Sequence, residues 1–454
     1  MKNERTVATE RIDDLPVLME WLKQMKVDAI IDDHTQAHGL WGGISKGVLG
    51  MTWIAHMIMT GDHRQVRLNE RLQGRRRSLG VMLGSEIRAS EFNDDRLGRL
   101  LTALGSGETA EVIEREMSAH CLRYYRLPTA QATVRIDTTS VAVQGDDDGG
   151  GVIAYGYSTD HRPDLKQFKV LMATLDPLGM PLLTQLMAGN SSDEGCYVPA
   201  YEEAIKTTGT DILVIGDSKM SALATRAHLH SRGSRYLTPL ALVGHTPADL
   251  AQWVEAAVTG TVALRRVNSA SAETLGRGYE VGREQTYRDE DRARTVTWQE
   301  RVLVMQSKAY ARAQATSLRA RLATARTALT ALTAGTGKGH RRYPTAAALH
   351  AACHSILDKH GVVGLLTVTL ACERQTRLGH AHRGRPRTHT PQPPQRLIEE
   401  VRYHVSKIHL DSQALAARIA RLGWRAYVTH APAQDWSLNE VVLAYRGEWR
   451  NTCF

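Results

Sequence analysis

The chain has 454 residues, of which 42% are hydrophobic and 23% are charged. These ordinary values exclude a largely disordered chain, and the length suffices for two or three domains. The 57 Lys and Arg residues outnumber the 48 Asp and Glu residues, giving a formal net charge of +9. This excess is consistent with a polyanionic partner such as double-stranded DNA, because binding phosphates releases counterions.

Targeting signals and cysteine frameworks are not evident. The longest apolar run, around residues 361–371, falls short of the ~20 residues that a membrane span needs. The first residues contain acids and lack the apolar stretch of a signal peptide, so we expect a cytoplasmic protein. The five cysteines are scattered and never in C-x-x-C spacing, which favours neither a disulfide framework nor a structural zinc site.

Residues 1–125 are predicted to form an all-helical domain. Apolar residues recur at helical spacing in LPVLMEWLKQM, ISKGVLGMTWIAHMIM and DDRLGRLLTALG. Between two of these helices lies a basic cluster of Arg71, Arg75, Arg76 and Arg77. The cluster is either a solvated loop or an edge that contacts phosphates.

Residues 126–245 show strand patterns instead. The β-branched run ATVRIDTTSVAVQG is followed by LKQFKVLMATLD and MPLLTQLMAG, which predict an antiparallel hairpin beside the first strand. A helix follows in SSDEGCYVPAYEEAIKTTG, with Ser192 or Asp193 as its N-cap. The apolar run DILVIGDSKM is typical of a buried central strand, and SALATRAHLHSRG and RYLTPLAL add a helix and a last strand. The predicted core is α/β, in the order β-β-β-α-β-α-β.

Residues 246–435 are predicted to form a mixed α/β insertion. Three strand candidates, VALRRVNSA, GYEVGREQTYR and TVTWQERVLVMQS, precede a long helix rich in Ala and Arg. The basic, proline-containing segment RQTRLGHAHRGRPRTHTPQPPQR is expected to be an exposed, extended loop. LIEEVRYHVSKIHLDSQALAARIARLGW is predicted to be helical before a short strand at 424–429. Residues 436–454 hold one more helix, from about 438 to 449.

Two aspartates are the first candidates for chemistry. Asp137 interrupts a β-branched run, where Asp is disfavoured; the alternative is a carboxylate that caps a neighbour near a strand end. Asp217 ends the run ILVIG, a position that commonly faces a ligand, although it is equally placed to cap the helix beginning near Ser221. Two carboxylates at neighbouring strand tips repel each other unless a cation lies between them, and hard oxygen ligands suit Mg²⁺ or Mn²⁺. The pair therefore predicts phosphodiester cleavage or transfer at two ions ~3.5–4 Å apart.

Several segments in fixed order resemble one known family. RIDTTS, GYSTDHRPDLKQFKV, GMPLLTQLMAGNSSD, VIGDSKM, RYLTPL and YRGEWR are similar to the DDE transposases of bacterial insertion sequences, more narrowly the IS-four-type group. The resemblance implies an RNase H-like mixed sheet in which Asp137 on the first strand and Asp217 on the fourth are catalytic, metal-binding acids. It also implies a DNA-contacting N-terminal domain and a C-terminal helix that completes the core. The implied activity is Mg²⁺-dependent (or Mn²⁺-dependent) cutting of transposon ends and joining to target DNA, by a homodimer.

The third acid of the family departs from its pattern here. The family motif is Tyr-x2-Arg-x3-Glu-x6-Lys, and Tyr445 matches its Tyr, but Glu448 stands at the Arg position and Thr452 at the Glu position. The chain ends at Phe454, so we expect a truncated helix and impaired catalysis. Glu448 is a weak substitute, because one helical turn of ~5.4 Å is large against metal–oxygen distances of ~2.0–2.1 Å.

Further candidates for DNA contact are Arg162, Lys166, Lys169, Trp298, Tyr445 and Arg446. The basic residues beside the hairpin either contact phosphates or form a solvated face. Trp298 either stacks on an extruded base or packs in the core of the insertion. Two other functions stay open: a DNA-binding protein without catalysis, such as an inhibitor of transposition, and a host RNase H-like nuclease, which the motif set disfavours.

Overall fold

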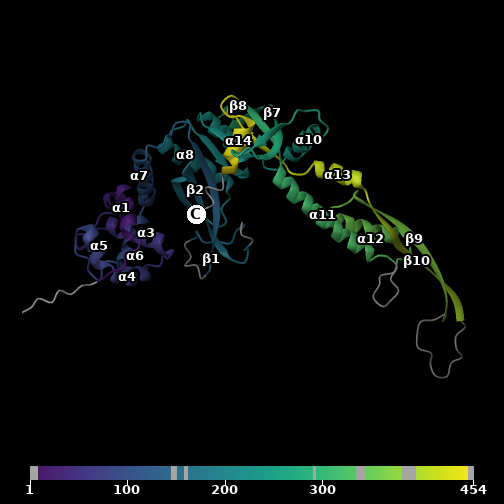
Figure 1. Cartoon of the computed structure of the whole chain (residues 1–454), viewed down its shortest axis with the longest axis horizontal. Coiled ribbons are helices and arrows are strands. Elements are labelled where there is room, and N and C mark those ends of the chain that lie inside the picture. The colour runs from purple at the N-terminus through teal and green to yellow at the C-terminus, as the bar shows by residue number, and fades with distance from the viewer. Residues whose placement is uncertain are drawn as a thin grey trace, which may run out of the picture.

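The computed structural model describes residues 9–144, 151–157, 162–289, 293–333, 343–380 and 395–447. Figure 1 shows three parts in a row: N-terminal helices, a large sheet with helices on it, and an arm that projects away from the sheet. Within the described ranges, every helix is too short or too polar to cross a lipid bilayer.

The N-terminal part is helical, as predicted. Its helices are α1 (Leu15–Gln24), α2 (Val27–His34), α3 (Lys46–Thr60), α4 (Gln65–Gln73), α5 (Arg76–Leu83), α6 (Asp94–Leu104) and α7 (Thr109–Tyr124). Leu15, Met19 and Leu22 follow helical spacing and are buried, so one face of α1 packs into the helical core. Ser45 caps α3 and Asn93 caps α6 by accepting hydrogen bonds from backbone N–H groups.

A nine-stranded sheet forms the centre of the molecule, in the order β3-β2-β1-β4-β5-β11-β8-β7-β6. The strands of the first half are β1 (Thr133–Val143), β2 (Lys166–Leu175), β3 (Met180–Ala188), β4 (Leu213–Gly216) and β5 (Arg235–Pro239). β1, β2 and β3 are antiparallel neighbours, whereas β4 runs parallel to β1 and β5 parallel to β4. This order and these directions make the core α/β and RNase H-like, as the sequence predicted.

Helices cover the two faces of this sheet. α8 (Tyr197–Thr208), α9 (Leu223–Ser231) and α10 (Thr246–Val258) pack on one face, and α14 (Leu438–Arg446) packs on the other. The short strand β4 is buried on both sides: Val214 joins the first cluster, and Leu213 and Ile215 join the second. Burial on both faces explains why the sequence of β4 is continuously apolar.

The three strands predicted after residue 245 are present and extend the same sheet. They are β6 (Arg265–Asn268), β7 (Thr274–Asp289) and β8 (Arg294–Ser307), and β11 (Trp424–Thr429) joins β8 to β5. Because the sheet runs without interruption across residue 245, the predicted division into domains stays a prediction.

The arm contains two errors of the sequence prediction. It consists of α11 (Lys308–Thr330), α12 (Ala346–Lys359), β9 (Leu366–His380), β10 (Gln395–Leu410) and α13 (Ser412–Ala420). Residues 397–410, predicted helical, belong to β10, and residues 374–380 of the predicted basic loop belong to β9; residues 381–394 lie outside the described part. The period of two in Val401, Tyr403 and Val405 is a strand signal, and pairing with β9 outweighs the helical propensity of the neighbouring Glu and Arg residues.

One buried ion pair links the sheet to α14. Arg135 on β1 has only 2% of its side chain exposed and contacts the Asp176 carboxylate at 2.6 Å. Its Nη2 also donates to the carbonyl oxygen of Ala444 at 2.8 Å. A Cβ on Gly447 would lie 2.8 Å from the same Nη2, so a side chain there would displace the guanidinium.

We expect Arg135→Ala to lower the free energy of unfolding by about 3 kcal/mol, because it leaves the Asp176 carboxylate without its partner in a largely buried position. Urea denaturation followed by circular dichroism measures this change. The matched control is Arg162→Ala, which breaks an Arg–Asp pair whose side chains are 49% and 61% exposed, and should leave the free energy of unfolding nearly unchanged. Equal losses in the two variants would contradict the structural role of Arg135.

Candidate active site

The structure brings Asp137 and Asp217 together. β1 and β4 pair in parallel with Ile136 opposite Gly216, so the next residue on each segment is one of the two aspartates. Neighbouring strands lie about 4.8 Å apart, and residues in register point to the same side. Asp137 on β1 and Asp217, the residue after β4, are therefore neighbours, and their part in metal binding and catalysis stays a prediction.

The environment of Asp137 disfavours its charged form. Burial raises the pKa of this carboxyl, a hydrogen bond from the Thr138 N–H at 2.8 Å opposes the rise, and the charges of Asp217 and Asp193 raise it further. The repulsion between Asp137 and its neighbours shows that a cation placed between the carboxylates would relieve an existing electrostatic cost.

Asp217 is held by three hydrogen bonds. Its Oδ1 accepts from the Tyr197 hydroxyl at 2.5 Å and from the Lys219 N–H at 2.8 Å, and its backbone oxygen accepts from Thr238 Oγ1 at 2.6 Å. Asp217 is thus also an N-cap, but of the 3₁₀ turn η2 (Ser218–Ser221) rather than of the following helix. Among the described residues, no hydrogen bond engages Oδ2 of Asp137 or of Asp217.

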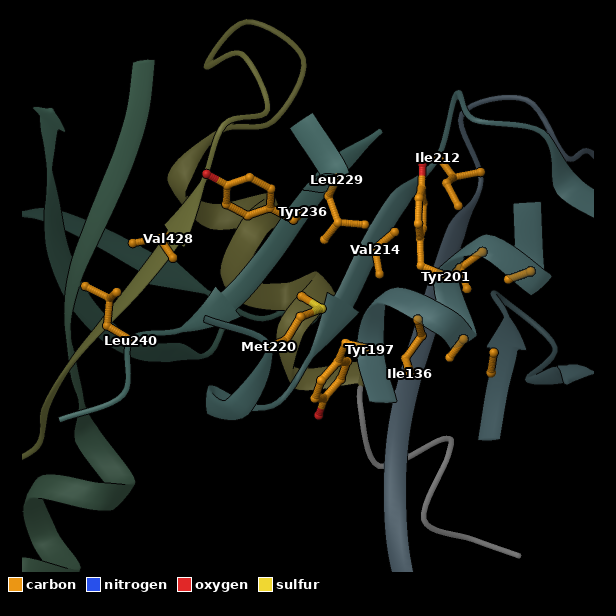
Figure 2. Packing of buried hydrophobic residues seen from close by; sticks show 14 of the residues in the cluster. Ile136, Tyr197, Tyr201, Ile212, Val214, Met220, Leu229, Tyr236, Leu240 and Val428 are labelled. Carbon is orange, nitrogen blue, oxygen red and sulfur yellow. The ribbon is translucent and has the colours of Figure 1, made fainter. Parts of the chain in front are cut away.

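Tyr197 lies on the α8 face of the sheet and orients Asp217 through its hydroxyl. Its side chain is 1% exposed and packs at the start of α8, beside Met220 and Ile136. Figure 2 shows its hydroxyl pointing away from this apolar cluster. Burial, followed by the charge and hydrogen bond of Asp217, raises the pKa of Tyr197 far above its ordinary value, so the hydroxyl keeps its proton and remains a donor.

Two carboxylates with one oxygen fixed and one oxygen unengaged fit a hard divalent cation. Mg²⁺ is commonly held by one or two carboxylates, with water and substrate phosphate completing its octahedron. No group of three or more His, Cys, Asp or Glu side chains able to hold a metal occurs in the described ranges. The described part of the site is a pair of acids, and water and substrate phosphate would supply the further ligands of the ion.

The end of α14 lies on the same face of β1 as Asp137. Arg135 and Asp137 are two residues apart on a strand and share a face, and Arg135 holds the carbonyl of Ala444. The end of α14 therefore lies beside β1, and the completion of the catalytic core by this helix stays a prediction. Glu448 and Thr452, the predicted positions for a third acid, lie outside the described residues.

Two of the proposed DNA contacts are wrong. Trp298 is 4% exposed and its indole N–H donates to the Tyr236 hydroxyl at 2.7 Å, so it cannot stack on an extruded base, and the core interpretation is confirmed. Lys169 is buried on β2, where its ammonium binds Asp193 at 2.6 Å and the Ser191 carbonyl at 2.7 Å. A buried lysine whose ammonium is bound to a carboxylate and a carbonyl does not meet DNA phosphates.

The other four candidates are placed as follows. Arg162 is exposed and paired with Asp164, and the Lys166 ammonium lies 5.9 Å from the ring centroid of Tyr155. Tyr445 packs against Tyr427, with 4.9 Å between ring centroids. Arg446 is exposed and donates to Ser307 Oγ at 3.3 Å. DNA contact by these four stays a prediction.

In the Arg cluster, Arg75 is paired with Asp13 and donates to the Arg11 carbonyl. Its guanidinium is thus committed within the N-terminal helices.

Three residues around the acids were not predicted from the sequence to belong to the site: Asp193, Tyr197 and Lys219. The sequence predicts Ser192 or Asp193 as a helix cap, but the Asp193 side chain makes no cap hydrogen bond and binds two lysines instead. Lys219 follows Asp217 by two residues, a spacing visible in the sequence, whereas Tyr197 carries no local signal because its partner is twenty residues away.

Comparison with known proteins adds no identification. No family model matches the chain, and no curated protein sequence matches it. Among solved structures, the crystal structure of the Mos1 strand transfer complex is similar at 14% sequence identity, over 59% of this chain and 78% of that chain, with a TM-score of 0.16. A TM-score this low carries no argument, so the assignment of the fold depends on the strand order and directions.

The raised pKa of Asp137 predicts a pH-dependent effect of Asp137→Asn. A carboxyl whose folded pKa exceeds its unfolded value, about 3.9, destabilises the fold above the folded pKa, and this cost disappears as the pH falls to the unfolded value. In EDTA, the variant should have a higher free energy of unfolding than the wild type at pH 7.5, and the gain should shrink toward pH 4. Urea denaturation at both pH values measures it.

The control for that experiment is Asp164→Asn. Asp164 is exposed, and a hydrogen bond from Arg162 lowers its pKa, so its replacement should give no gain at pH 7.5. A gain for Asp137→Asn that is the same at both pH values would contradict the electrostatic explanation.

Proposed function

We propose that this chain is a transposase of the DDE type, which binds double-stranded DNA at the ends of an insertion sequence and carries out metal-dependent strand cleavage and transfer. The observation that carries the proposal is the pair formed by Asp137, within β1, and Asp217, directly after the end of the neighbouring β4, in an RNase H-like sheet. The net charge of +9 supports a polyanionic partner. The family resemblance of the sequence motifs supplies the insertion-sequence context and the homodimeric active complex.

In this proposal each residue has a distinct task. Asp137 and Asp217 hold Mg²⁺ or Mn²⁺ through the oxygens that the protein leaves unengaged, and the Thr138 and Lys219 N–H groups and the Tyr197 hydroxyl fix the other oxygens. When bound, such ions polarise a phosphodiester and lower the pKa of an attacking hydroxyl. The site residues therefore position the ion, while the DNA phosphate supplies further ligands.

The rate we expect is low. Thr452 stands where the family motif has its third acid, and a missing ligand at a phosphoryl-transfer site reduces the rate by orders of magnitude. Glu448 follows directly on Gly447 in the sequence and is the candidate for a third ligand in this proposal. The second function is a DNA-binding protein that occupies element ends without cutting them. The same net charge of +9 supports it, and the Thr at position 452, where the family motif has Glu, is the observation that favours it.

Binding and cleavage of linear duplex DNA separate these functions. We expect binding whose affinity falls steeply with NaCl concentration, and slow Mg²⁺-dependent nicking that Asp217→Asn reduces by at least about a hundredfold. Labelled duplexes on denaturing gels, with Mg²⁺ or with EDTA, measure the cleavage. Robust cleavage that Glu448→Gln abolishes would establish a third ligand at 448, and binding with no cleavage at all would establish the second function.

Tyr197→Phe tests the orientation of Asp217. Loss of the hydroxyl removes one of two donors from Oδ1, and partners of this kind contribute about tenfold or more to metal affinity. We expect Mn²⁺ to bind about tenfold more weakly, as measured by titration calorimetry. Tyr201→Phe is the matched control, because that buried hydroxyl on the same helix pairs with Ser234, and it should leave Mn²⁺ affinity unchanged. Equal effects of both variants would mean that they act only through packing.

A further inference from the structure

Lys219 lies at the edge of the acid pair. It is two residues beyond Asp217 in the turn η2, and its own N–H donates to Asp217 Oδ1 at 2.8 Å. This bond ties the position of the Lys219 backbone to the carboxylate that the proposed function places at the metal. The side chain of Lys219 is 51% exposed, so its ammonium reaches solvent beside the site.

The partner of Lys219 is Asp193, which precedes α8. One carboxylate oxygen of Asp193 binds the Lys169 ammonium at 2.6 Å, and the other lies 3.2 Å from the Lys219 ammonium. The two lysines differ in exposure and in their other hydrogen-bond partners. Lys169 is 8% exposed and also donates to the Ser191 carbonyl, whereas the Lys219 ammonium has Asp193 as its hydrogen-bond partner among the described residues.

The charge of Asp193 is compensated without Lys219. Burial raises the pKa of Asp193, but hydrogen bonds from Lys169 and Lys219 outweigh burial and lower it, and Lys169 makes the shorter contact. If Lys219 leaves, the pair of Asp193 and the buried Lys169 stays intact. A half-exposed ion pair contributes little to stability, so exchanging one anionic partner of Lys219 for another costs little.

Asp193 also lies close enough to the acids to affect them. Its charge contributes to the raised pKa of Asp137, after burial and the charge of Asp217. Three carboxylates and two ammonium groups therefore share this edge of the sheet. A DNA strand whose phosphate approached the acid pair would pass the Lys219 ammonium, the more exposed of the two cations.

We propose that Lys219 binds a backbone phosphate of DNA beside the acid pair, and that the Asp193 carboxylate occupies its ammonium until DNA takes that place. The proposal rests on the proposed function, because it needs DNA at Asp137 and Asp217. It makes Asp193 an internal competitor for the phosphate, and it assigns the phosphate contact of this edge to Lys219 in place of the buried Lys169.

The test measures binding of a fluorescent blunt DNA duplex to the full chain in EDTA, across a NaCl titration. Lys219→Gln should weaken binding about tenfold at low salt and reduce the slope of log affinity against log salt by about 0.9, the value for one phosphate contact. Lys219→Arg should restore most of the affinity. Asp193→Asn should strengthen binding severalfold, because its amide oxygen still accepts from Lys169 while the competing charge is gone.

Lys206→Gln is the matched control. Lys206 is 55% exposed and pairs with Glu203 near the far end of α8, so its replacement should change neither the affinity nor the slope. A Lys219→Gln protein that binds like the Lys206→Gln protein would overturn the phosphate contact, and an Asp193→Asn protein that binds no more tightly than the wild type would overturn the exchange. A wild-type chain that fails to bind the duplex would overturn the proposed function itself, a result distinct from either.

Discussion

The parallel register of β1 and β4 is the constraint on which the rest of the site depends. Once Ile136 pairs with Gly216, two aspartates must stand beside each other at a depth where charge is poorly solvated. Much of the surrounding polar structure lowers the cost of this arrangement. Backbone N–H groups and a buried hydroxyl donate to the carboxylates, and ammonium groups balance the third carboxylate nearby.

The two faces of the sheet divide the work around the acids. On the face of α8, Tyr197 packs with the apolar cluster and reaches the strand edge with its hydroxyl. On the face of α14, Arg135 anchors the helix end and orders the approach of the C-terminal segment. The same strand thus carries a structural ion pair and, two residues later, a candidate metal ligand. Arg135 is buried, which strengthens its ion pair with Asp176, whereas Asp137 is partly exposed and accessible to an ion.

The core strands and the two acids were predictable from sequence because their signals are local. A β-branched run interrupted by Asp137, and an apolar run that stops at Asp217, are visible within ten residues each. The partners of the acids were not predictable, since Tyr197 meets Asp217 across 20 residues and Lys169 meets Asp193 across 24. The burial of Lys169 follows from the pairing of β2 with its neighbours. The burial of Trp298 follows from the continuity of the nine-stranded sheet, which the sequence did not reveal.

The junction of the arm with the sheet has a mechanical consequence. α11 begins at Lys308, directly after β8 ends, and the chain returns from α13 to β11 through three residues. Gly423 closes this return at a positive φ, where a Cβ would lie 2.5 Å from that of Ala311 on α11. The arm that carries β9 and β10 is therefore joined by short connections to β8 and β11, which are neighbours in the sheet (Figure 1). A force applied to β9 and β10 would therefore be transmitted to β8 and β11, and through β11 to β5, the strand next to β4.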